Sequence, residues 1–129
     1  MKTYSLRPGL ALICVMLCTQ AQGYGGGSGG ASCAEAEFYR ESPVRNSTVS
    51  AFDRFAIIAS ENTDMNTLDL QINGVKAQPN ITPQRTGESL IELKMDPPLN
   101  TPGKIRITLR AKSKDGCETF LPIYLEVKS

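Results

Sequence analysis

Cysteine is the most reactive side chain in this sequence, because the 129 residues include four cysteines and no histidine. General acid–base and nucleophilic catalysis usually recruit histidine, a free thiol or paired carboxylates. The carboxylates between Asp53 and Asp69 are scattered, and the glycines from Gly25 to Gly30 do not open a helix as a phosphate-binding loop does. We therefore expect no enzyme activity and no bound cofactor.

An oxygen-rich segment, residues 60–64, contains side chains of the types that bind calcium. Glu61, Asn62 and Asp64 offer carboxylate and amide oxygens, which calcium prefers as ligands. Their spacing matches no defined calcium loop. The alternative is a turn between two strands, in which Asn and Asp side chains bond to the local backbone. The segment is a candidate metal site, with a structural turn as the competing interpretation.

The N-terminal residues have the layout of an export signal. Two basic residues, Lys2 and Arg7, precede an unbroken apolar run over residues 10–18, and small residues follow at Ala21 and Gly23. The run is shorter than the roughly 20 apolar residues of a membrane span. We predict a signal peptide over residues 1–23 and no membrane span after its cleavage; an uncleaved signal anchor is the alternative.

Signal cleavage would leave two cysteines, Cys33 and Cys117. In an exported chain such a pair predicts one disulfide. It would close a loop of about 84 residues, for which chain entropy gives on the order of 4 kcal/mol of stabilisation. Two thiolate metal ligands are the alternative, although no histidine is present to join them.

The rest of the mature chain is predicted to comprise a Gly/Ser-rich flexible tether, residues 24–32, and one folded domain, residues 33–129. Without Lys2 and Arg7, 12 of the 14 basic residues remain against 13 acidic ones, a formal net charge of −1. This balance favours neither nucleic acid nor an anionic membrane surface as a partner.

Apolar and polar residues alternate along much of the domain, which is typical of strands with one buried face. Residues 104–111 and 121–127 are the clearest examples, and Gly116 lies in the turn between them. Asn73-Gly74 predicts a second hairpin, and Val75 and Ala77 are expected to continue the buried apolar face on its return arm. Pro122 predicts that the last strand lies at a sheet edge or contains a bulge. Further strands are expected near residues 37–40, 55–59, 68–72, 75–77 and 91–95. About seven strands in this length predict an all-β, antiparallel two-sheet sandwich, with a small barrel as the alternative.

Turn and strand residues recur in a defined order over residues 38–127. The pattern comprises Ser42-Pro43, Asn46 and Val49 before Phe55-Ala56-Ile57, then residues 67–75, Pro98-Leu99, Pro102-Gly103 and residues 111–116. It resembles the bacterial Ig-like domains of surface-layer proteins and invasins. The resemblance implies an Ig-like sandwich outside the cytoplasm without enzyme activity. Cys33 and Cys117 are not general in such domains and indicate a free-standing unit.

Ser42-Pro43 at the opening of the domain also resembles periplasmic copper-resistance sandwiches. That family binds copper largely through histidines, and this chain has none. Met65 and Met95 alone do not replace them, because a copper site needs a cluster of suitable ligands.

Two aromatic residues of the last strand, Phe120 and Tyr124, have the parity opposite to Leu121, Ile123 and Leu125. They are expected to point outward, where they could contact a partner or cover the flank of the sandwich. We predict a non-catalytic, periplasmic or extracellular Ig-like module that serves as a binding or accessory structural subunit for a protein partner. A periplasmic copper- or calcium-binding protein is the alternative.

Overall fold

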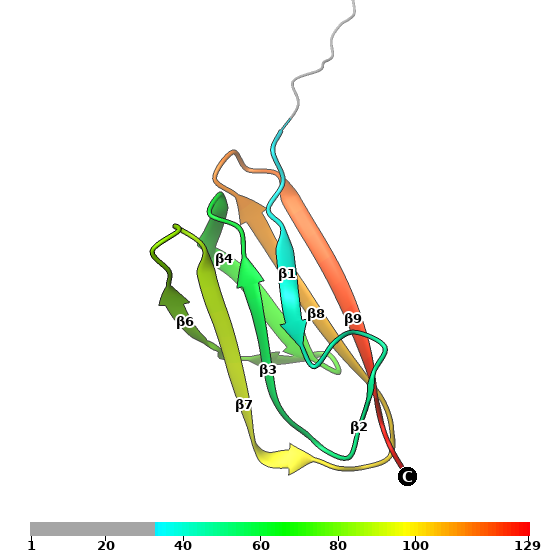
Figure 1. The fold of residues 1–129 in the computed structure, drawn as a ribbon. Coiled ribbons are helices and arrows are strands. Elements are labelled where there is room, and N and C mark those ends of the chain that lie inside the picture. Colours follow the sequence, from blue (N-terminus) through cyan, green and yellow to red (C-terminus); the bar gives the residue numbers. More distant parts are fainter. Residues whose placement is uncertain (1–32) are drawn as a thin grey trace, which may run out of the picture. The chain divides into compact units, whose positions relative to one another are not determined.

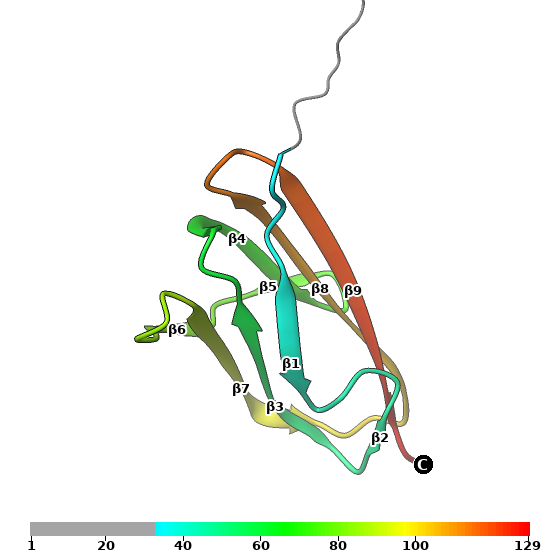
Figure 2. The ribbon, with the colours of Figure 1, turned by 45° about the horizontal axis from the view of Figure 1, so that its top comes forward.

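The computed structural model describes residues 33–129, so the predicted signal peptide and tether lie outside the described residues. This part of the chain folds into nine strands in two sheets (Figures 1 and 2). The strands are β1 (Phe38–Ser42), β2 (Thr48–Val49), β3 (Phe52–Ala59), β4 (Thr63–Ile72), β5 (Val75–Ala77), β6 (Asn80–Pro83), β7 (Ser89–Leu99), β8 (Gly103–Ser113) and β9 (Glu118–Val127). Residues 33–129 contain no helix that is long and apolar enough to cross a membrane.

One sheet has four antiparallel strands in the order β1-β3-β7-β6. Its centre is the β3–β7 pair, in which Phe55 lies opposite Leu93 and Ile57 opposite Ile91. β1 shifts register between Tyr39 and Ser42, where Arg40 adopts a φ of 58°. An unpaired residue of this kind bends an edge strand without ending it.

The other sheet has five strands in the order β2-β9-β8-β4-β5. β8 and β9 form a hairpin paired without interruption from Gly103 opposite Val127 to Lys112 opposite Glu118. Gly116 turns this hairpin with a φ of 92°, a conformation that costs glycine little. The two-residue β2 runs parallel to β9 and covers only its last residues.

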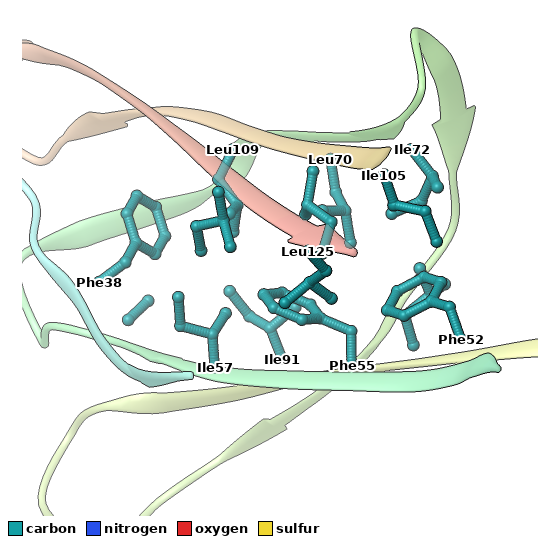
Figure 3. Packing of buried hydrophobic residues seen from close by; sticks show 14 of the residues in the cluster. Phe38, Phe52, Phe55, Ile57, Leu70, Ile72, Ile91, Ile105, Leu109 and Leu125 are labelled. Carbon is teal, nitrogen blue, oxygen red and sulfur yellow. The ribbon is translucent and has the colours of Figure 1, made fainter. Parts of the chain in front are cut away.

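The hydrophobic core lies between the two sheets. Figure 3 shows Phe52, Phe55 and Ile57 of β3 with Ile91 of β7, facing side chains of the five-stranded sheet. These opposing side chains are Leu70 and Ile72 of β4, Ile105 and Leu109 of β8, and Leu125 of β9. Because successive strand residues point to opposite faces, the residues between these core positions lie on the outer face of each sheet.

The predicted all-β, two-sheet sandwich is confirmed, and two open sheets replace the alternative of a closed barrel. The seven predicted strands are present; β2 and β6 are additional. The hairpin at Asn73-Gly74 is confirmed, with φ angles of 52° and 84°. The prediction that Val75 belongs to the buried face was wrong: its side chain is 69% exposed, because it lies on the edge strand β5, where it lines an open apolar groove.

Candidate functional site

Cys33 and Cys117 form the predicted disulfide, with their Cα atoms 5.8 Å apart. It joins the start of the folded domain to the residue just before β9. Hydrogen bonds hold the same segment: the Thr119 hydroxyl donates to the Ala36 carbonyl at 3.0 Å, and the backbone N–H of Ser60 donates to the Glu37 carbonyl at 2.8 Å. A disulfide is consistent with an oxidising compartment. The bond therefore has a structural role, and the two thiols are not available as metal ligands.

The candidate calcium ligands are each engaged with a different neighbour. The Asn62 amide donates to the Glu35 carbonyl at 3.0 Å, while its oxygen accepts a bond from the Ser60 hydroxyl. An oxygen of Asp64 accepts a bond from the Asn66 N–H at 3.1 Å, and the Glu61 side chain lies against Gly87. Within residues 33–129, no three His, Cys, Asp or Glu side chains are grouped so that they could share a metal ion. The segment acts locally as a turn that ties the N-terminal residues to the sandwich.

Phe120 and Tyr124 lie on the outer face of β9, with exposed fractions of 51% and 41%. Each ring has an arginine of β8 directly across the hairpin: Arg110 faces Phe120, and Arg106 faces Tyr124. The Arg110 guanidinium carbon lies 4.8 Å from the centre of the Phe120 ring, within the range of a cation–π contact. Aromatic and arginine side chains are the types enriched at protein interfaces.

A groove of about 140 Å³ lies on this outer face over β4 and β8, with Phe120 of β9 as part of its rim. Thr108 lines the groove between Arg106 and Arg110 on the same face of β8, and it lies opposite Pro122 of β9. Gln71 of β4 lies opposite Thr108 on the other side. The side chains lining the groove are Asp69, Gln71, Arg106, Thr108, Arg110 and Phe120.

The charges around this groove are unevenly paired. Arg110 lies 4.0 Å from Glu118, and Asp69 lies 3.7 Å from Lys76 and accepts a bond from Gln71. Among the described residues, Arg106 forms no ion pair. Its cross-strand neighbour is Tyr124, which is not an acidic residue. The groove therefore contains a cationic group without an anionic partner in the described part of the chain.

Sequence reasoning singled out Phe120 and Tyr124 but missed Arg106, Thr108 and Arg110. The sequence does contain a signal for a basic strand face, because residues 104, 106, 110 and 112 are all basic and alternate with the apolar residues of the same strand. Their position beside the aromatic rings depends on the register of the β8–β9 hairpin, which fixes which side chains are neighbours.

Two other hollows have different chemistry. An apolar groove of about 300 Å³ at the open edge of the sandwich is lined by Ile72, Val75, Met95 and Leu99, among others. A hollow of about 320 Å³ on the outer face of the four-stranded sheet has a mixed rim of Arg54, Lys94 and Glu92.

The clearest electrostatic perturbations lie away from these hollows. Hydrogen bonds from Arg45 lower the pKa of Glu41 from 4.5 to about 2. The Tyr39 hydroxyl donates to Glu88, which raises the pKa of the tyrosine and lowers that of the glutamate. In both pairs a side chain of β1 bonds to a residue of a neighbouring turn, so we assign both pairs a structural role.

Comparison with solved structures identifies the fold. CopC from Methylosinus trichosporium OB3b superposes with a TM-score of 0.55 at 15% identity, over 72% of this chain and 93% of that chain. PcoC, a methionine-rich copper resistance protein from Escherichia coli, gives a TM-score of 0.51 at 22% identity, over 74% of this chain and 100% of that chain. This chain shares their fold. It is an Ig-like β-sandwich. No family model and no curated protein sequence matches the chain.

A copper site does not fit the residues that the structure describes. The chain has no histidine, and Met65 and Met95 lie on different sheets. Met95 lines the apolar groove together with Ile72, whereas Met65 lies seven residues earlier on β4, roughly 20 Å away along the strand. The two thioethers therefore cannot bind one ion in this arrangement.

Proposed function

We propose that this protein is an exported, non-catalytic binding module whose working surface is the outer face of β8 and β9. The observation that carries the proposal is the pair of exposed aromatic rings, Phe120 and Tyr124, each facing an arginine across the hairpin. Exposed aromatic and arginine side chains dominate the binding energy of many protein interfaces. The disulfide supports the extracytoplasmic setting.

A β-sandwich fold is compatible with a non-catalytic binding module. It does not select this function, because one sandwich fold carries many functions. Both rings sit on a hairpin whose strands are paired without interruption, so little backbone freedom is lost when a partner binds.

The test is isolation of the tagged full chain from the envelope of its native host. We expect a defined complex that is lost in the double variant F120A/Y124A and retained in Ile81→Ala, which truncates an exposed side chain on the other sheet. Unchanged thermal unfolding of both variants would show that folding is intact. A wild-type chain that stays monomeric, or a complex indifferent to the double variant, would refute the proposal.

Copper binding is the second candidate, favoured by the fold shared with PcoC, a methionine-rich copper resistance protein. This comparison supports a metal-binding protein better than it supports a surface-layer type of subunit. The ligands are the weak point, since the described residues hold no clustered histidine or methionine site.

Elemental analysis of the purified protein, followed by titration with Cu(I) and Cu(II), tests this candidate; calcium belongs in the same analysis. From the ligand geometry we expect less than one equivalent of either metal to be retained after dialysis. Stoichiometric copper that is lost in the double variant M65L/M95L would overturn this expectation and favour the copper function.

A further inference from the structure

We propose that the groove over Thr108 binds an acidic side chain of an extended partner segment, between apolar contacts to Phe120 and Tyr124. The inference rests on the proposed function and specifies the chemistry of its partner. The predicted ligand pattern is apolar–any–acidic–any–apolar in extended conformation.

The pattern follows from the spacing of the rows on the sheet. Three rows cross the hairpin: Phe120 with Arg110, Pro122 with Thr108, and Tyr124 with Arg106. Neighbouring rows are two residues apart along each strand, about 7 Å. An extended partner segment repeats its outward side chains with the same spacing, so positions i, i+2 and i+4 meet the three rows in turn.

The middle row is low because Thr108 and Pro122 are shorter than the rings and guanidiniums on both sides. The groove of about 140 Å³ lies over Thr108 of this row, between Arg106 and Arg110, and extends from Phe120 towards Asp69 and Gln71 of β4. The outer rows present aromatic rings that are 51% and 41% exposed, so they can contact apolar side chains of the partner.

Charge selects the middle side chain of the partner. Arg106 has no acidic partner among the described residues, while Asp69 already interacts with Lys76 and Gln71. Arg110 shares one carboxylate, Glu118, at 4.0 Å and stacks on Phe120. A carboxylate placed between the two arginines would gain charge-assisted hydrogen bonds, for which guanidinium groups are well suited.

Binding to the face is favoured over addition of a strand to the edge of β9. Pro122 has no N–H to donate to an added strand. Nearer the C-terminus, the Asn46 N–H donates to the Tyr124 carbonyl at 2.7 Å, and β2 pairs with Glu126 and Val127. Little of the edge is left for a continuous ladder, whereas the outer face is open.

The experiment is a titration of the ¹⁵N-labelled domain with an acetylated, amidated peptide of sequence Ser-Leu-Ser-Glu-Ser-Leu-Ser. We expect saturable amide shifts at residues 106–110 and 120–124, and weaker binding at higher salt. The matched peptide with Gln in place of Glu should bind about tenfold more weakly. Arg106→Gln should cause a similar loss, whereas Arg54→Gln, an exposed arginine of β3 on the other sheet, should cause none.

Equal binding of the Glu and Gln peptides would overturn the inference, as would shifts confined to the four-stranded sheet. Saturable binding of polygalacturonate in place of the peptide would also overturn it, because the ligand would then be an anionic polysaccharide. A native complex lost in F120A/Y124A but unaffected by Arg106→Gln would refute the acidic pattern while leaving the proposed function intact. Absence of any native complex would instead refute the proposed function.

Discussion

Glu41 and Arg45 form the best-defined ion pair of the described residues. Nε of Arg45 donates to Oε2 of Glu41 at 2.6 Å, and its Nη2 donates to Oε1 at 3.1 Å. The glutamate side chain is only 11% exposed, so water competes weakly for its oxygens. This pair joins the end of β1 to the following turn, which leads to β2.

The lowered pKa of Glu41 predicts a specific loss of stability in acid. A carboxyl whose pKa falls on folding stabilises the fold above its unfolded value and loses that contribution as the pH drops through its folded value. Here the window runs from 4.5 down to about 2. We expect Glu41→Gln to lower the free energy of unfolding by about 1 kcal/mol at pH 7, and by little at pH 2. Urea denaturation at both pH values measures the difference.

Glu92→Gln is the matched control, because it alters an exposed glutamate of β7 that makes no ion pair among the described residues. It should change stability by less than about 0.5 kcal/mol at pH 7. A loss in Glu41→Gln that is as large at pH 2 as at pH 7 would show that the ion pair is not its cause.

At the scale of elements, the disulfide determines how firmly the N-terminal segment is held. The sequence separation of 84 residues between its cysteines leads us to expect that C33S/C117S lowers the free energy of unfolding by about 4 kcal/mol. Ala36 is buried and Thr119 bonds to its carbonyl, so the variant should keep the same fold. Urea midpoints with circular dichroism as the probe measure both effects.

Reductant supplies the control for this prediction. Under reducing conditions the wild type and C33S/C117S should unfold at similar urea concentrations. If the oxidised wild type and the variant already share a midpoint, the disulfide does not stabilise the domain.

Strands were predictable from sequence where burial imposes alternation, and not elsewhere. In β8 the inward side chains Ile105, Ile107 and Leu109 are nearly fully buried, so the period of two is clear in the sequence. All four residues of β6 are exposed, and β2 has only two residues, so neither carries an alternating pattern. Val75 was misassigned because alternation predicts which face a residue occupies and not whether the opposite sheet covers it.

At the scale of the whole molecule, the candidate site could be predicted only in part. Parity alone placed Phe120 and Tyr124 on the outside of the last strand. The groove needs three strands in register: Gln71 of β4, Thr108 of β8 and Pro122 of β9 form one row, although 51 residues separate the first from the last. Such long-range register follows from packing of the complete sandwich, which no local pattern encodes.

The position of the disulfide also determines how the domain would transmit mechanical load. A pull applied at Cys33 and at Ser129 would cross the sulfur–sulfur bond to Cys117. It would then continue along β9, which leads to the C-terminus in Figure 1. Strands β1 to β8 lie inside the covalently closed loop and would bear no tension. Because β9 is already extended, it can lengthen very little under load. The oxidised domain would therefore behave as a nearly inextensible link, holding the face of β8 and β9 in shape while its two ends are pulled apart.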